Sequence, residues 1–288
     1  MANYQILTDS CCDFTGQMYR QYNISYIPLT VLQNGESHAD FTDEKELKAF
    51  FGELRQGAEI KTAAANPESW TAAMEPILKE GRDLLVLAFS SGLSTTYQSA
   101  VIAARELQEQ YPQRKVHVVD TLCASLGQGL LVWYAARMRD AGMDLEELTA
   151  WVEGHKLNLC HWFTVDDLMY LKRGGRVSAA TALLGTMLQI KPVLHVDDEG
   201  HLINVSKARG RRASIEALAK KLGETGLPGE NETVFICHGD CLEDARYLEK
   251  LVKDNYGVKN VVIGYVGAVI GSHSGPGTLA LFFLGEHR

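Results

Sequence analysis

Hydroxyl side chains cluster at sequence positions where an apolar run ends or a helix begins. In open parallel sheets, ligands bind outside the carboxyl ends of the strands, so these hydroxyls are expected at one edge of a sheet. Hydroxyls together with free helix amides suit an anion, and the Ser94 region offers both. Each residue alone is also explained as a helix cap. The segments are Thr8-Asp9-Ser10, Lys61-Thr62 in the loop before Asn66, Ser90–Thr96, and Thr121 with Ser125.

The motifs that the sequence lacks narrow the choice of anion. There is no Walker A motif and no G-x-G-x-x-G after a strand, so ATP, GTP and dinucleotides are poor candidates. Gly127 and Gly129 lie inside a predicted helix and indicate close packing rather than a phosphate loop. Acyl transfer by a Ser94 nucleophile stays open as an alternative, although the sequence has no G-x-S-x-G motif.

Three further segments in the second half of the chain could bind an anion or a partner. Two are basic: KRGGR, which ends at Arg176, and KARGRR, which contains Arg209, Arg211 and Arg212. Such patches attract acidic groups, or else are solvated surface. In the third, three glycines and a proline surround His273, which predicts an irregular loop that presents this histidine.

Composition excludes several functional classes. The net charge of −8 argues against general nucleic-acid binding, and 46% hydrophobic residues predict an ordered globular chain. No apolar segment is long enough to span a membrane, and the N-terminus does not resemble a signal peptide, so we expect a cytoplasmic protein. The six cysteines are expected to be free thiols. Cys237-His238-x-x-Cys241 lacks a second ligand pair, so no metal site is predicted.

The elements that must position these residues are predicted to form an α/β protein of two domains. In residues 1–156, strands alternate with helices, which predicts a three-layer α/β/α domain with a parallel sheet. The run ISYIPLTV (24–31) is expected to be one strand of that sheet, and Thr42 is expected to cap a helix. In residues 157–288, the runs at 190–196 and 201–208 flank the turn DDEG and predict a hairpin, hence a mixed sheet.

Taken together, these segments resemble those of the DegV family of bacterial fatty-acid-binding proteins, and the resemblance covers about residues 4–285. Each matching stretch is short, but their order and spacing together are specific. They are Thr8-Asp9-Ser10-x-x-Asp13, Lys61-Thr62, Asn66-Pro67, Ser90-Ser91-Gly92-Leu93-Ser94-x-Thr96-Tyr97-x-Ser99-Ala100, Asp120-Thr121, Leu171–Arg176, Lys191-Pro192 and Gly271-Ser272-His273-x-Gly275-Pro276-Gly277.

The resemblance implies that the protein binds a long-chain fatty acid such as palmitate. Thr62 and Ser94 would hydrogen-bond the carboxylate, and Arg176 and His273 would lie near it, with Asp9 and Ser10 in the same neighbourhood. Ala63 and Thr95 depart from the Ser and Gly that the family often has there, which affects the detailed geometry around the head group. The tail would occupy an apolar slot, with candidates at Leu183–Leu188 and the runs at 190–196 and 278–284.

The resemblance also implies a non-enzymatic role and particular partners. The protein would be a carrier without a cofactor, and some members of the family present their fatty acid to a separate fatty acid kinase. Our default expectation for the oligomeric state is a monomer. Two other classes stay open: an acyl hydrolase or transferase that uses Ser94 or His273, and a regulatory module whose arginines 209, 211 and 212 dock a partner.

Overall fold

A four-stranded parallel sheet forms the centre of the first half of the molecule. The computed structural model describes residues 3–33, 35–178 and 189–288. The strands are short apolar runs bounded by turn residues, as expected for strands covered on both faces. In spatial order they are β2 (Ile24–Ile27), β1 (Tyr4–Asp9), β6 (Asp83–Ala88) and β7 (Val116–Asp120).

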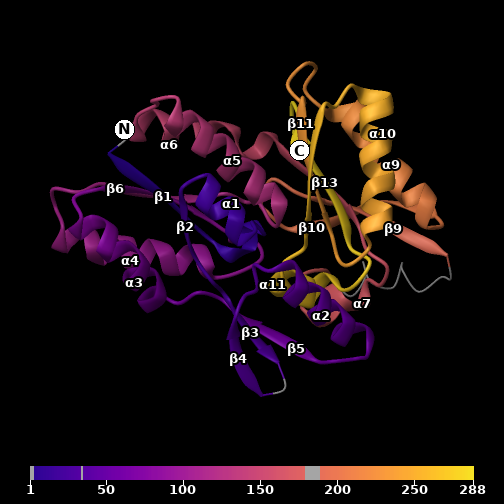
Figure 1. The fold of residues 1–288 in the computed structure, drawn as a ribbon, viewed down its shortest axis with the longest axis horizontal. Coiled ribbons are helices and arrows are strands. Elements are labelled where there is room, and N and C mark those ends of the chain that lie inside the picture. Colours follow the sequence, from indigo (N-terminus) through magenta and orange to yellow (C-terminus); the bar gives the residue numbers. More distant parts are fainter. Residues whose placement is uncertain (1–2, 34, 179–188) are drawn as a thin grey trace.

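Helices cover both faces of this sheet, which makes the predicted three layers (Figure 1). On one face lie α3 (Pro67–Lys79) and α4 (Thr96–Gln110), and on the other lie α5 (Leu126–Asp140) and α6 (Leu145–His155). The short α1 (Gly16–Gln21) packs against β2. Two helix starts follow their predicted caps: Asn66 accepts from the Ser69 amide across 2.8 Å, and Asp144 from the Glu147 amide across 2.9 Å.

The expected strand ISYIPLTV is two strands in two different sheets, so that prediction is wrong. Pro28 separates them, because it has no N–H to continue a ladder. The second strand, β3 (Thr30–Gln33), is the centre of an antiparallel sheet between β4 (Glu36–Ala39) and β5 (Ile60–Ala63). Thr62 therefore lies on a strand, paired with Val31, and not in a loop. The next helix, α2 (Glu44–Arg55), is capped by Asp43 and not by Thr42.

A six-stranded mixed sheet organises the second half, as the hairpin pattern predicts. Its inner part is antiparallel, and β11 and β12 pair in parallel at one edge. In spatial order the strands are β10 (Leu202–Arg209), β9 (Ile190–Val196), β8 (Leu159–Thr164), β13 (Leu279–Leu284), β11 (Thr233–His238) and β12 (Asn260–Tyr265). The accompanying helices are α7 (Met169–Arg173), α9 (Arg211–Thr225), α10 (Leu242–Tyr256) and α11 (Ala268–Ser274), with short 3-10 turns η1 (Ser10–Cys12) and η2 (Lys156–Asn158).

Helix α5 packs between the two halves. It contacts β8, β11 and β13 of the mixed sheet as well as the turn η1 after β1, and it is buried along most of its length. Gly127 permits this approach, because a Cβ there would overlap the His161 ring. Gly129 does the same against the Cys12 carbonyl, at 2.7 Å from a built Cβ. Both glycines are thus packing contacts, as the sequence indicates.

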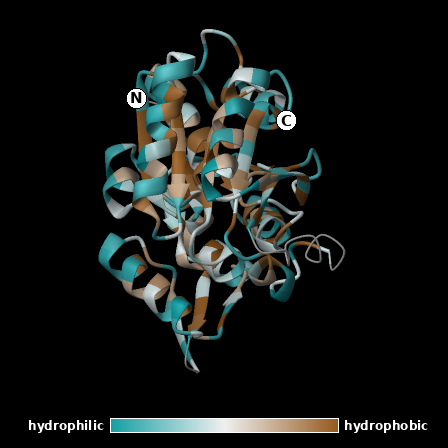
Figure 2. Cartoon of the chain, turned by 90° about the vertical axis from the view of Figure 1, so that its right-hand side faces the viewer, coloured by the Kyte–Doolittle hydropathy of each residue, from teal (hydrophilic) through white to brown (hydrophobic). Residues whose placement is uncertain are grey.

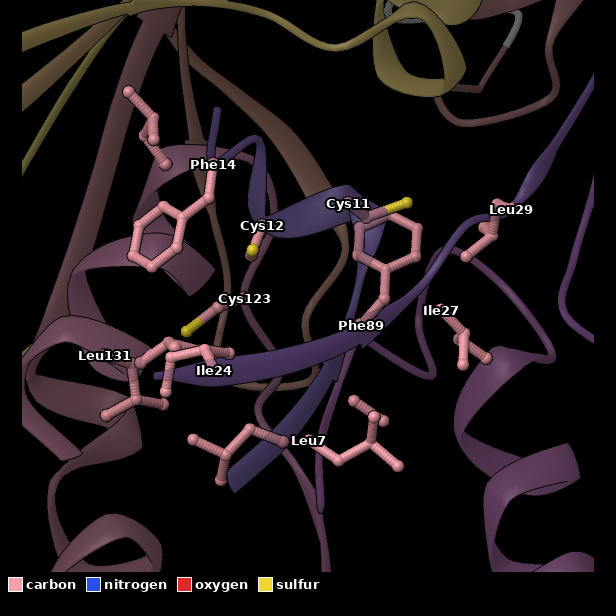
Figure 3. Close-up of a cluster of buried hydrophobic side chains, with 14 of the residues drawn as sticks. Leu7, Cys11, Cys12, Phe14, Ile24, Ile27, Leu29, Phe89, Cys123 and Leu131 are labelled. Atoms are coloured by element: carbon pink, nitrogen blue, oxygen red, sulfur yellow. The ribbon is translucent and has the colours of Figure 1, made fainter. Parts of the chain in front are cut away.

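Apolar side chains fill the interior around these elements. In Figure 2 the strands are brown inside the molecule, and the outer helices carry teal faces. Figure 3 shows one part of the core, where Cys11, Cys12 and Phe14 of the first turn lie with Cys123 and other buried side chains. All six cysteines are free thiols, which confirms the prediction. Among the described residues, no helix has the length and apolar character that crossing a membrane requires.

Candidate functional site

A cavity of about 490 Å³ opens between the β6–α4 loop, helix α11 and the face of the mixed sheet that α5 also covers. This volume is in the range of ligand pockets in proteins. The wall is mainly apolar, and its larger side chains include Phe89, Phe163, Val196, Leu202, Val269 and Phe282. A few polar side chains interrupt this wall and decide what the cavity can hold.

Four of the predicted site residues line this cavity. Thr62 comes from β5, Ser94 from the loop before α4, Arg176 from the segment after α7, and His273 from α11. The structure therefore brings together residues that are up to 211 positions apart in the sequence. His273 lies in the last turn of a short helix and not in the expected irregular loop, because the helix continues until Gly275, whose φ is +79°.

The hydroxyl of Ser94 contacts Thr96, at the first turn of α4. Its Oγ lies 2.8 Å from Thr96 Oγ1 and accepts from the Thr96 amide across 3.2 Å. In the described contacts, no histidine joins this serine in a nucleophile–base pair, since the His273 ring pairs with Thr62. The arrangement therefore gives no geometric support to the Ser94 hydrolase alternative.

Thr62 and His273 form a second polar contact in the cavity wall. Thr62 Oγ1 lies 2.8 Å from His273 Nε2. Burial, with a smaller effect of the Arg176 cation, lowers the pKa of His273 to about 4, so the ring is neutral near pH 7. Gly174 is directly beside the ring, and a Cβ there would overlap Nδ1.

Arg176 supplies positive charge to the cavity and also connects the loop before α4 to the segment after α7 by hydrogen bonds. Its Nε and Nη2 donate to the Leu93 carbonyl across 3.1 and 3.0 Å, and its Nη1 donates to the Gly174 carbonyl. Burial lowers the pKa of this arginine. A guanidinium nevertheless stays charged in proteins, so the site is electrostatically suited to an anion.

Asp9 and Ser10 are not among the residues that line the cavity, and their place in the head-group neighbourhood stays a prediction. Both are buried, and Asp9 accepts from the Phe89 amide across 2.7 Å. Ser10 donates to Asp40 across 2.7 Å and accepts from the Leu29 amide across 3.0 Å. These side chains fix the backbone behind Phe89 and Leu29, which do line the cavity.

The carboxyls in this buried region have raised pKa values. Burial outweighs the hydrogen bonds that Asp9 accepts and raises its pKa to about 7. The same cause raises the pKa of Asp40 to about 6, and that of Asp13 well above its ordinary value. The sequence pointed to Asp13 only as part of the first motif of the resemblance and did not point to Asp40, because nothing local predicts that a loop carboxyl becomes fully buried.

The three arginines that the sequence suggests for partner docking differ in whether an ion pair within the chain already compensates their charge. Arg211 pairs with Asp244 across 2.8 Å and lies 3.6 Å from Asp166. Arg212 pairs with Glu216 across 3.1 Å and covers the Tyr247 ring. Arg209 is exposed at the end of β10, an edge strand. Two of the three charges are therefore already compensated within the chain.

Sequence reasoning found only part of the cavity wall. The run at 190–196 contributes Val196, and the run at 278–284 contributes Thr278, Ala280 and Phe282, whereas Leu183–Leu188 lies outside the described residues. The sequence reasoning did not identify His161 and Phe163 of β8, although their alternation along the strand places them on one face. Within the described ranges, no three His, Cys, Asp or Glu side chains gather to hold a metal ion.

Comparisons with known proteins show what the chain as a whole is similar to. A family model described as "Uncharacterised protein, DegV family" matches residues 3–286. The DegV domain-containing protein CPE0026 of Clostridium perfringens is 45% identical over 100% of this chain and 99% of its own length.

Solved structures resemble the chain over its whole length. A protein of Thermotoga maritima whose structure is described as revealing fatty acid binding function is 32% identical, with a TM-score of 0.87 over 99% of this chain and 100% of that one. A fatty-acid-binding DegV family protein of Thermus thermophilus is 30% identical, with a TM-score of 0.87 over 98% and 99%.

Proposed function

The chain belongs to the DegV family, and from this premise we propose that it binds a long-chain fatty acid such as palmitate, with Thr62 and Ser94 holding the carboxylate. The observation that carries the proposal is the cavity itself. Thr62, Ser94, Arg176 and the neutral His273 share a wall with large apolar side chains. Charge-assisted hydrogen bonds suit a carboxylate, and the apolar wall suits a hydrocarbon tail.

The tail would supply most of the affinity. Each buried CH₂ contributes about 0.8 kcal/mol, so a long chain outweighs the few hydrogen bonds of the head group. The head-group contacts would then fix which end of the ligand meets Ser94 and Arg176. Arg176 would also balance the charge of the carboxylate in a half-buried setting.

Native mass spectrometry of the purified protein, followed by release of the ligand under denaturing conditions, tests this proposal. We expect a bound species with the mass of a fatty acid of about 14–18 carbons, since ligands of drug size fill cavities of this kind. The double variant Thr62→Ala/Ser94→Ala is expected to lose it. A protein that is purified empty and takes up neither palmitate nor oleate would sink the proposal.

The role that fits this site is that of a carrier whose ligand is modified elsewhere. In the part of the chain that the structure describes, the Ser94 hydroxyl contacts Thr96 and not a general base, which supports binding without catalysis. We therefore expect the loaded protein with ATP alone to leave palmitate unchanged, and added fatty acid kinase to convert it to an acyl phosphate. Conversion of palmitate by the protein alone would favour the enzyme alternative.

A further inference from the structure

Ser94 Oγ has two hydrogen-bond partners among the described residues, and both belong to Thr96. The Thr96 amide donates to it across 3.2 Å, and the Thr96 hydroxyl lies 2.8 Å away. Thr96 is the first residue of α4 and is completely buried. Thr96 does not itself line the cavity, so any effect it has on a ligand passes through Ser94.

Burial determines which hydroxyl donates in this pair. A buried hydroxyl proton without an acceptor is costly, because no water can replace the missing bond. Within the described part of the chain, Ser94 Oγ is the partner of the Thr96 hydroxyl, so Thr96 donates and Ser94 accepts. A hydroxyl has two lone pairs and one proton. The two groups of Thr96 fill both lone pairs of Ser94, and its own proton is left for the cavity.

We propose that Thr96 is a positioning residue that makes Ser94 an obligate donor, so that the site selects head groups presenting only acceptors. A carboxylate is such a group, and a primary amide of the same shape is not. The inference rests on the proposed function and adds to it the residue that sets head-group preference.

The tautomer of His273 decides whether Thr62 acts in the same sense. If the proton of the neutral imidazole is on Nε2, His273 donates to Thr62 Oγ1 across the 2.8 Å contact, and the Thr62 proton is left for a ligand. Thr62 would then be a second donor and would reinforce the preference for a carboxylate over an amide, whose NH₂ would face a donor. If the proton is on Nδ1, Thr62 donates to the histidine, and the preference rests on Ser94 alone.

Competition binding with delipidated protein tests this inference, with palmitate and hexadecanamide as probes of equal tail length. The variant Thr96→Val keeps the shape of the side chain and removes the hydroxyl, whereas Thr96→Ser keeps the hydroxyl. Thr121→Val is the matched control, because Thr121 is also completely buried but bonds the Ala88 carbonyl across 2.8 Å, away from Ser94. Thr96→Ala serves as a second variant should Thr96→Val not fold.

In Thr96→Val, we expect the Kd for palmitate to rise about three- to tenfold, the size of one hydrogen bond. The preference for palmitate over hexadecanamide should shrink, because Ser94 can then accept from the amide. Thr96→Ser and Thr121→Val should keep the wild-type preference. In a Ser94→Ala background, Thr96→Val should change little further, since its effect acts through Ser94.

Three results would overturn the inference: an unchanged preference in Thr96→Val and Thr96→Ala, an equal loss in Thr96→Ser, or a full additional loss in the Ser94→Ala background. Failure of the proposed function looks different, because the wild-type protein would then bind neither palmitate nor its amide.

Discussion

The residues around the proposed head-group site are held by contacts that leave little room for change. Gly174 is an example, because a Cβ at this position would overlap the ring of His273. The histidine would have to turn away from Thr62, to which it is now bonded across 2.8 Å. A residue without a side chain thus sets the position of one that contacts the site.

We therefore expect Gly174→Ala to weaken palmitate binding, by about tenfold if one charge-assisted contact of the head group is lost. Titration calorimetry of the delipidated protein measures this. Gly154→Ala is the control: this glycine lies in α6 with nothing within 4 Å of a built Cβ, so binding should not change and stability should rise slightly. Unchanged binding in Gly174→Ala would show that the His273 contact contributes nothing.

Asp9 gives a prediction about pH. Its pKa is raised from 3.8 to about 7 by burial, so the folded state holds its proton more tightly than the unfolded state between about pH 4 and 7. Stability from this carboxyl is therefore present at low pH and is lost as pH rises through about 7. Three buried histidines have the opposite effect on the free energy of unfolding: they lower stability as the pH falls below about 6.5. The reason is that burial lowers the pKa of His195, His238 and His273 to about 4.

The variant Asp9→Asn separates the two effects. Denaturant unfolding at pH 7.5 and 5.5 should show the wild-type advantage over D9N growing on acidification, by up to about 1.4 kcal/mol per pH unit. The histidines are the same in both proteins and cancel in the difference. An advantage that stays constant with pH would mean that Asp9 is ionised throughout in the folded protein.

At the scale of elements, α5 is closely packed on the face that carries Gly127 and Gly129. A Cβ at Gly127 would overlap His161 of β8 and lie 2.7 Å from Phe282 of β13. Gly127→Ala should therefore destabilise the protein by about 1–3 kcal/mol, the usual cost of overpacking a core. Thermal unfolding measures this, with Gly154→Ala in α6 as the helical glycine that has free space. A Tm equal to that of the wild type would show that the sheet yields to the added methyl.

The sequence predicted those elements whose signals are local. The caps Asn66 and Asp144 and the hairpin of β9 and β10 follow from short patterns. The three-stranded sheet could not be foreseen in this way. Whether Thr62 lies on a strand depends on pairing with Val31, and whether β3 leaves the first sheet depends on which strand edges are free. The family resemblance implied roles for Thr62, Ser94, Arg176 and His273, whereas the contacts of Thr96 and the burial of the carboxyls needed the three-dimensional structure.

At the scale of the whole molecule, the mainly apolar wall of the cavity predicts that affinity depends on the chain length of the ligand. Each methylene added to the ligand should lower the Kd about fourfold, corresponding to about 0.8 kcal/mol, until the tail meets the end of the cavity. Competition among saturated acids from decanoate to stearate measures this series. Equal affinities across the series would mean that the tail is not buried.

Both α5 and the cavity connect the two halves of the molecule, so we expect the halves to unfold together. The division at residue 156 is a prediction from the sequence, yet α5 contacts the mixed sheet, and the cavity takes walls from β5, α11 and β8.

A ligand that binds only the folded protein stabilises it by about 2.7 kcal/mol when its free concentration is 100 times its Kd. Palmitate should therefore raise one common Tm, in a single transition whose calorimetric and van't Hoff enthalpies agree. If palmitate instead shifted one of two separate transitions, the halves would be independent, and the ligand would draw its affinity from one of them alone. Differential scanning calorimetry of delipidated and loaded protein distinguishes these outcomes, because a ligand that spans both halves couples their unfolding.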